Sequence, residues 1–150
     1  MKGLEIDNID IKILKLLQDD AKISSKEIAK KLFLSAPTVK SRIDALKKKG
    51  IIKGYYVEID NSVFSNVIKC FVEIGVSPEK KEELYDVLEQ SPNVVECDRV
   101  TGEYSLIAKV IFKNTIEMDK FINKIQYYGK TRTQIIFSTL INRRGVDLSK

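Results

Sequence analysis

Apolar side chains recur every three to four residues through roughly the first third of the chain, which is the spacing of one face of an α-helix. A first helix is predicted to begin at Asp7 or Asn8, either of which can cap it, and to end before Asp19. A second, short helix is capped by Ser24 or Ser25. The inward positions of these two helices are Ile9, Ile13, Leu16 and Leu17, then Ile28, Ala29 and Leu32.

A third helix follows after a short break that ends at Ser35, its predicted cap. Pro37 falls in the first turn, where a missing backbone N–H costs nothing. The inward stripe of this helix is Val39, Ile43 and Leu46, and Gly50 ends it. A tight turn between the second and third helices predicts a helix-turn-helix. The segment IIKGYYVEID (51–60) is then predicted to form a short hairpin, or wing, before a linker.

The second half of the chain changes to strands that alternate with helices. Strands are predicted at VIKCFVEIGV (67–76), VVECDRV (94–100), SLIAKVIF (105–112) and QIIFSTLI (134–141), with helices opened by Pro78 and by Asn114 or Thr115. The order βαββαβ is the ferredoxin-like arrangement, one antiparallel sheet with two helices on a single face. Apolar residues on both faces of the strands indicate that the other face pairs with a second subunit.

The expected fold class is therefore α+β, with two domains and a dimer formed through the second. Residues 1–60 form the winged helix-turn-helix domain with its linker. Residues 61–150 form the ferredoxin-like domain for effector binding and oligomerisation.

Positive charge is concentrated in the helix-turn-helix. The whole chain carries 26 lysine and arginine residues against 21 acidic ones, a net charge of +5. Between Lys22 and Lys53, ten basic residues face only Glu27 and Asp44, a net charge of +8 in a short segment. This distribution is the footprint of a polyanion-binding element, although a solvated lysine-rich face would look the same.

Composition removes most enzyme classes. The chain has no histidine, which excludes Ser-His-Asp and Cys-His nucleophiles and the usual zinc and haem ligands. Cys70 and Cys97 lie in apolar runs and are expected to be buried thiols, not a disulfide or a metal pair. We therefore expect no catalytic residue, no metal and no cofactor. Without a bilayer-spanning run or a secretory signal, a cytoplasmic location is expected.

The two halves together resemble the Lrp/AsnC family, the leucine-responsive or "feast/famine" transcription regulators of bacteria and archaea. The resemblance rests on SAPTVKSRIDALKKKGII in the helix-turn-helix, on VTGEYSL, and on KTRTQIIFSTL near the end. It covers nearly the whole chain. It implies a DNA-binding regulator that dimerises through the ferredoxin-like domain, assembles further into octameric discs or open helices, and binds an amino acid where dimers meet.

The helix after the tight turn is the element that enters the major groove of DNA. The groups predicted to contact DNA are Ser35, Ala36, Pro37, Thr38, Lys40, Ser41, Arg42, Lys47, Lys48 and Lys53. Thr38, Ser41 and Arg42 are assigned to bases and the lysines to phosphates, while the backbone at Ser35 and Ala36 offers N–H groups to a phosphate. The alternative for Arg42 is an ion pair that orders the fold.

The resemblance places the effector at the turn after the second strand of the sheet. The candidate residues are Thr101, Gly102, Glu103, Tyr104 and Ser105, with Thr131 and Thr133 from the last strand lining the same pocket. Many family members carry an aspartate where this chain has Ser105, so Glu103 would have to bind a ligand's ammonium group. A plain glycine-containing turn is the alternative.

Three other functions remain open at this stage. Proteins resembling this family also act as sirohaem decarboxylases, but those depend on histidine. A chromatin-like architectural protein would bind DNA through its lysines with little sequence preference. A pure oligomerisation module would not bind DNA at all. The prediction is a sequence-specific regulator of double-stranded DNA, a homodimer or possibly an octamer.

Overall fold

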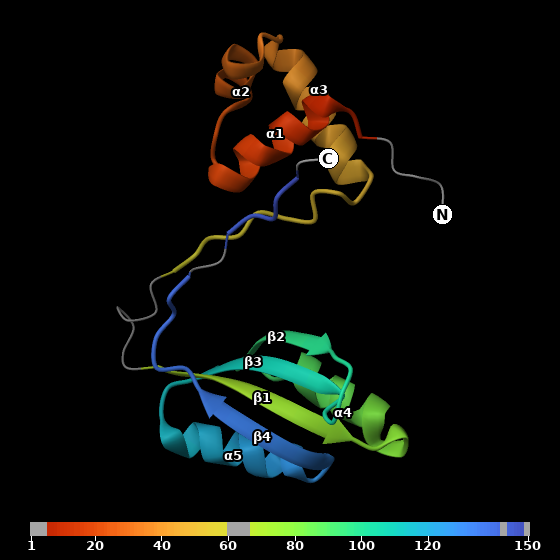
Figure 1. The fold of residues 1–150 in the computed structure, drawn as a ribbon, viewed down its shortest axis with the longest axis vertical. Coiled ribbons are helices and arrows are strands. Elements are labelled where there is room, and N and C mark those ends of the chain that lie inside the picture. The colour runs from red at the N-terminus through yellow and green to blue at the C-terminus, as the bar shows by residue number, and fades with distance from the viewer. Residues whose placement is uncertain (1–5, 60–66, 142–143, 149–150) are drawn as a thin grey trace. The chain divides into compact units, whose positions relative to one another are not determined.

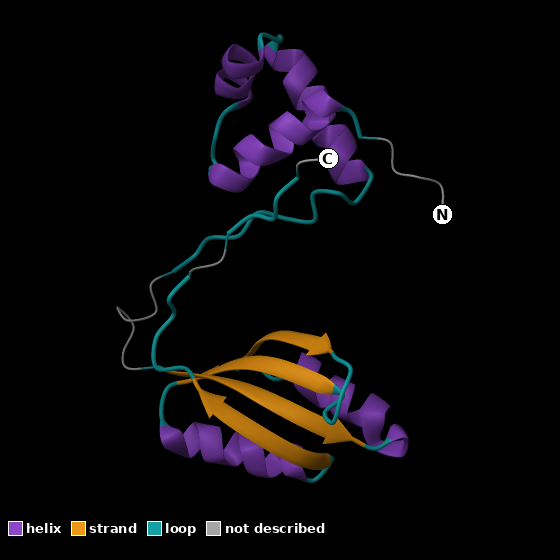
Figure 2. Ribbon diagram, in the orientation of Figure 1, coloured by secondary structure: helices purple, strands orange, loops and turns teal. Residues whose placement is uncertain are grey.

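The computed structural model of the 150-residue chain describes residues 6–59, 67–141 and 144–148. The chain forms two compact units (Figure 1). The first comprises Met1–Glu58 together with Ile141–Lys150, and the second comprises Ile59–Leu140. Helices make up the first unit, and a sheet with helices makes up the second (Figure 2).

Three capped helices build the first unit: α1 (Asn8–Asp19), α2 (Ser25–Leu32) and α3 (Ala36–Lys48). Each cap predicted from the sequence is present. Asp7 caps α1, Ser24 caps α2 through a reciprocal capping box with Glu27, and Ser35 caps α3. The buried core is Ile13, Ile28, Ala29, Val39, Ile43 and Leu46. The predicted inward stripe of α3 is thus confirmed.

Two residues with positive φ connect and end these helices. Gly50 follows α3 at φ +70°, as predicted for a helix-ending glycine. Phe33 ends α2 in the left-handed conformation, with φ 54° and ψ 45°, and its N–H donates to the Ala29 carbonyl. A side chain with a Cβ is strained in this region, so a phenylalanine here holds a conformation that glycine adopts freely.

The predicted hairpin at 51–60 is wrong for the nine of those residues that the structure describes, because residues 51–59 contain no strand. Ile51 and Ile52 instead pack against the helical core. Their N–H groups both donate to the Leu46 carbonyl, at 3.0 and 3.3 Å. These bonds close the end of α3, so this part of the segment is a helix terminus rather than a strand.

The second unit is a four-stranded sheet in the order β2-β3-β1-β4, in which every neighbouring pair is antiparallel. The strands are β1 (Ile68–Val76), β2 (Val94–Arg99), β3 (Leu106–Phe112) and β4 (Gly129–Ile135). A short 3₁₀ turn, η2 (Pro78–Lys80), leads into α4 (Lys81–Glu89), and α5 (Thr115–Gln126) follows β3. This is the predicted ferredoxin-like order.

Both helices cover the same face of the sheet (Figure 2). Alternate residues of β1, namely Cys70, Val72 and Ile74, are buried beneath them. The helices contribute Leu84, Leu88, Phe121 and Ile125 to this core, and the Phe112 and Phe121 rings pack at 5.3 Å. Among the residues that the structure describes, no helix of this unit covers the opposite face of the sheet (Figure 2).

The last strand was predicted at 134–141, whereas β4 ends at Ile135. Pairing begins at Gly129, directly after the turn that follows α5, and a Cβ at Gly129 would lie 2.0 Å from the Gly75 carbonyl oxygen. This approach fixes the register of β4 against β1. The more apolar residues then lie past the sheet, with Phe137 98% and Leu140 94% exposed.

The two cysteines differ. Both are free thiols; Cys70 is buried as predicted, while Cys97 is exposed, so that prediction is wrong. Cys97 lies on β2, an edge strand whose residues are exposed apart from the half-buried Val94. In the part of the chain that the structure describes, no group of histidine, cysteine or acidic residues could hold a metal ion. Nor is any described helix both long and apolar enough to cross a bilayer.

Replacing Phe33 with glycine is expected to raise the free energy of unfolding by about 1 kcal/mol, because it relieves the left-handed strain. The ring is 95% exposed, so little packing is lost. This value already includes the opposing effect of glycine, which increases the conformational entropy of the unfolded chain and so favours unfolding. Thermal unfolding followed by circular dichroism measures it. An equal or lower midpoint than that of the wild type would show that the ring stabilises the turn.

Candidate functional site

The exposed face of α3 is polar and basic. Burial of Val39, Ile43 and Leu46 leaves the other side of the helix in solvent. The predicted DNA-contacting residues that are exposed there, on α3 or beside it, are Ser35, Pro37, Thr38, Lys40, Ser41, Lys47, Lys48 and Lys53, while Ala36 is half-buried. The structure therefore exposes most of the predicted residues, on α3 or directly before or after it.

The N-terminus of α3 is organised by a pair of hydroxyls. The Ser35 hydroxyl accepts from the Thr38 backbone N–H at 3.2 Å and lies 2.7 Å from the Thr38 hydroxyl. This bond fixes both side chains in the first turn of the helix. Thr38 is thus held in one orientation, with its remaining hydrogen-bonding capacity directed to solvent.

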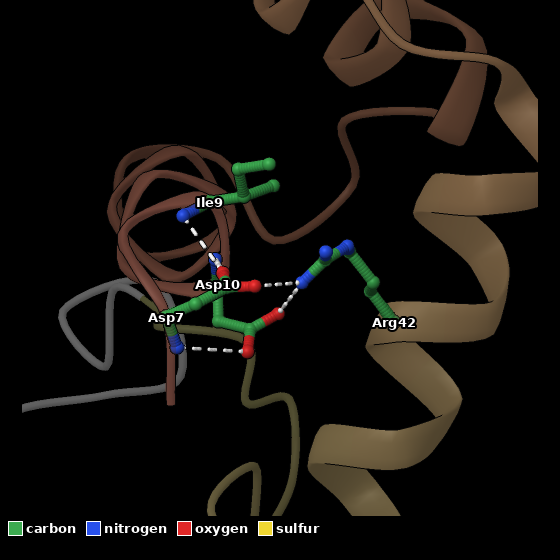
Figure 3. Close-up of polar contacts among 4 residues, drawn as sticks. All are labelled: Asp7, Ile9, Asp10 and Arg42. Atoms are coloured by element: carbon green, nitrogen blue, oxygen red, sulfur yellow. Dashed lines mark hydrogen bonds and ion pairs between the residues drawn. The ribbon is translucent and has the colours of Figure 1, made fainter. Parts of the chain in front are cut away.

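Arg42 does not project freely from α3. Its Nη1 donates to Asp7 Oδ2 at 2.7 Å and to Asp10 Oδ1 at 2.8 Å (Figure 3). Asp7 is the N-cap of α1 and Asp10 is in its first turn, where each carboxylate also accepts backbone N–H groups. The Arg42 side chain is 30% exposed and that of Asp10 only 11%. We call these three residues the Arg42 clamp.

Within the clamp, Arg42 and Asp7 each stabilise the charged form of the other. The pKa of Asp7 is lowered, first by the backbone hydrogen bond from Asp10 and then by the Arg42 guanidinium. The pKa of Arg42 is raised by its hydrogen bonds to Asp7 and Asp10. The clamp therefore holds a charged guanidinium between two carboxylates and ties α3 to the start of α1.

The position of Arg42 in this structure does not leave it free for the predicted base contact. A guanidinium that reads guanine needs its fork of donors free in the groove, whereas this one already binds two carboxylates. The ion pair with Asp7 and Asp10, which ties α3 to the start of α1, matches the other predicted role of Arg42. Thr38 and Ser41 remain as candidate base contacts on α3.

A second candidate site lies on the face of the sheet that the helices leave open. A cavity of about 200 Å³ adjoins the turn between β2 and β3. Its lining residues are Glu73, Val100, Thr101, Glu103, Tyr104, Ile107 and Arg132. Three of the predicted effector residues, Thr101, Glu103 and Tyr104, thus share one hollow. Gly102 supplies the turn with φ +118°, a conformation that favours glycine.

Charged pairs line this cavity. Arg132 Nη2 lies 2.8 Å from Glu73 Oε1 and 2.5 Å from Oε2, and Lys130 Nζ lies 2.7 Å from Glu103 Oε1. The pKa of Glu103 is lowered by its hydrogen bond from Lys130. Both cations also lie beside the Tyr104 ring, at 5.2 and 5.3 Å from its centroid. The hollow therefore presents two carboxylates, a guanidinium and an aromatic ring.

Four predicted effector residues do not line this cavity: Gly102, which only forms the turn, and Ser105, Thr131 and Thr133. The Ser105 hydroxyl donates to the Ile74 carbonyl, and its oxygen accepts from the Val76 N–H, both at 3.3 Å, which ties the turn to the end of β1. Thr131 and Thr133 pair with Ile74 and Val72, whose side chains are buried under the helices. Since paired residues share a face, both threonines lie on the opposite side of the sheet from the cavity. Their predicted place in the pocket is wrong.

Some residues of these sites escaped the sequence reasoning. Asp7 was recognised only as a cap, and Glu73 and Arg132 were not considered. A cap that carries a second acid three residues later was the available signal for the clamp. For the cavity, alternation along β1 and β4 would have put Glu73 and Arg132 on the open face once the register was known.

Comparison with known proteins agrees with this architecture. Residues 6–53 match the family described as winged helix-turn-helix DNA-binding, and residues 69–146 match the Lrp/AsnC ligand binding domain. The chain therefore belongs to the Lrp/AsnC family of transcriptional regulators.

Named relatives cover nearly the whole chain. The HTH-type transcriptional regulator LrpC of Bacillus subtilis is 31% identical over 95% of this chain and 99% of its own. Its solved structure superposes with a TM-score of 0.85 over 93% of this chain and 100% of LrpC. FL11 of Pyrococcus horikoshii is 33% identical over 89% of this chain and 91% of its own. This protein is accordingly a DNA-binding transcription regulator with a ligand-binding domain.

Replacing Arg42 with alanine is expected to lower the stability of the helical unit by roughly 1–2 kcal/mol, because Asp10 loses its charged partner in a largely buried setting. Hydrogen exchange of α1 and α3, followed by mass spectrometry, measures the loss within this unit.

The matched control is Lys40→Ala, which removes an exposed cation from the same helix and should change stability by no more than about 0.5 kcal/mol.

The stabilisation by the clamp is also expected to depend on pH. Because the pKa of Asp7 in the folded protein lies below its ordinary 3.8, the clamp stabilises fully above about pH 4. This stabilisation is lost as the pH falls through the folded pKa of Asp7. The difference in free energy of unfolding between the wild type and Arg42→Ala should therefore become smaller as the pH falls below about 4. An equal effect of both substitutions would contradict the clamp.

Proposed function

We propose that this regulator reads its operator through the exposed face of α3 and that a small-molecule effector, most plainly an amino acid, acts through the cavity at the turn between β2 and β3. It works as a homodimer or a higher oligomer and has no catalytic activity. The observation that carries the DNA part is the polar, basic surface that remains on α3 after its apolar stripe is buried.

The contacts on α3 divide by chemistry. Thr38 and Ser41 offer hydroxyls to base edges, while Lys40, Lys47 and Lys48 neutralise phosphates. Lys53 extends the same charge beyond the helix, and the backbone N–H groups at Ser35 and Ala36 can donate to a phosphate at the helix N-terminus. Arg42 takes no part, because its guanidinium is engaged by the clamp.

An α-amino acid matches the charges of the cavity. Its ammonium group can replace Lys130 at Glu103, and its carboxylate can bind Arg132. The Glu103 and Lys130 side chains are 67% and 56% exposed. Ion pairs this exposed contribute little to stability, so replacing Lys130 with the ligand's ammonium group costs little free energy. A solved regulator from Neisseria meningitidis with the same fold, 18% identical with a TM-score of 0.88, is described as a complex with L-Met.

The proposed dimer would cover apolar surface that one chain leaves open. Phe71 and Ile107 lie on the face of the sheet opposite α4 and α5. Past β4, Phe137 and Leu140 are almost fully exposed. Apolar surface of this extent in a single chain is typical of an interface between copies.

One observation favours a second function, that of an architectural DNA-binding protein with little sequence preference. The net charge of +8 between Lys22 and Lys53 comes almost entirely from lysines, which bind phosphates without reading sequence. An architectural DNA-binding protein would use the same surface. The ratio of affinities for an operator and for unrelated DNA separates the two functions.

Ser41→Ala is expected to weaken binding to the DNA upstream of the protein's own gene by about fivefold, with less effect on a scrambled duplex, because a hydroxyl contact to a base is lost. Its partner variant Lys40→Ala should weaken both duplexes and lower the slope of log K against log salt by about one. Fluorescence anisotropy titrations at several salt concentrations measure these changes. Equal losses on both duplexes for Ser41→Ala would remove it from base reading.

Glu103→Gln is expected to abolish the shift in DNA affinity or oligomeric state that a mixture of free amino acids causes, because the ligand's ammonium group loses its carboxylate. Basal DNA binding should stay within about twofold, since Glu103 lies in the other unit from α3. Titration with and without the amino acids measures the response, and Glu82→Gln on α4 is the matched control. A full response by Glu103→Gln would contradict the assigned site.

A further inference from the structure

Phe33 combines two features that no packing role explains. Its side chain is 95% exposed, so the ring stabilises the core little. Its backbone lies at φ 54°, where glycine or asparagine would be at ease and a phenylalanine is strained. Within the three helices and their connections, residues 6–50, no other large apolar side chain is exposed; the next ones, Tyr55, Tyr56, Val57 and Ile59, follow α3. The chain therefore keeps an exposed aromatic ring at a conformationally unfavourable position.

The ring adjoins the DNA-reading surface along the chain. Phe33 follows the last turn of α2, which carries the exposed cations Lys30 and Lys31, and precedes the Ser35 cap of α3 by two residues. The left-handed turn is what joins α2 to α3, since the Leu34 N–H bonds back to the Ala29 carbonyl at 2.9 Å. Whatever approaches the N-terminus of α3 also meets this turn.

We propose that Phe33 is a DNA-contact residue whose ring packs on apolar groups of the duplex beside the groove that α3 enters. Deoxyribose carbons and the thymine methyl group are the two apolar surfaces that DNA offers there. The ring is surrounded in sequence by cations and hydroxyls, which suit a phosphate backbone, whereas a protein-docking surface would need a contiguous apolar patch. This contact rests on the DNA binding of the helix-turn-helix and adds a non-ionic term to it.

The test compares Phe33→Gly with Phe33→Tyr in the full-length protein, on the duplex upstream of its own gene. Phe33→Gly should bind about five- to tenfold more weakly than the wild type, which is the size of one lost apolar contact. The slope of log K against log salt should not change, because no phosphate partner is removed. Phe33→Tyr keeps the ring and should bind within about twofold of the wild type.

Two features make the result decisive. Phe33→Gly relieves backbone strain, so weaker binding by an equally or more stable protein cannot come from unfolding. A duplex with deoxyuridine in place of thymidine separates the two apolar surfaces. If the substitution removes the difference between wild type and Phe33→Gly, the ring contacts methyl groups; if the difference persists on both duplexes, the ring contacts sugars.

The proposal is overturned if Phe33→Gly binds the duplex as tightly as the wild type. It is also overturned if the only change is in the oligomeric state, measured by sedimentation, since the ring would then serve a protein contact. Failure of the broader DNA-binding assignment is a different result, because the wild type itself would then show no affinity for the duplex.

Discussion

Burial of one stripe of α3 determines which face of this helix the helical unit presents to solvent. Val39, Ile43 and Leu46 face the buried core that α3 shares with α1 and α2, where they are shielded from water. The rotation of α3 about its axis is thereby fixed, and so is the set of side chains that it presents to solvent. The caps at Ser24 and Ser35 place the ends of the helices, but the stripe decides which face is outward.

The Arg42 clamp and the charged cavity both contain ion pairs, but these pairs differ in how exposed they are. In the clamp, one guanidinium bridges two carboxylates that already receive backbone N–H groups, one of them largely buried, so the arrangement is rigid. Around the cavity, the Glu103–Lys130 pair is mostly exposed and easily exchanged. The clamp thus holds α3 against α1, whereas the exposed pair beside the cavity is free to rearrange.

The sequence predicted the features that depend on neighbours along the chain. Helix caps, the apolar stripe of α3 and the βαββαβ order follow from residues within a few positions of each other, and all three are confirmed. The features that the sequence did not predict depend on contacts between distant residues. Arg42 meets Asp7 across 35 positions, and the register of β4 follows from the approach of Gly129 to Gly75, which no local pattern reveals. Thr131 and Thr133 were misplaced for that same reason.

The central claim is that α3 recognises sequence and does not only attract DNA. Equilibrium binding of the wild-type protein to its own upstream duplex and to a scrambled duplex, at two salt concentrations, tests this most directly. The account predicts a tighter complex with the upstream duplex whose advantage persists at the higher salt, since base contacts release few counterions. Equal and steeply salt-dependent binding to both duplexes would contradict it.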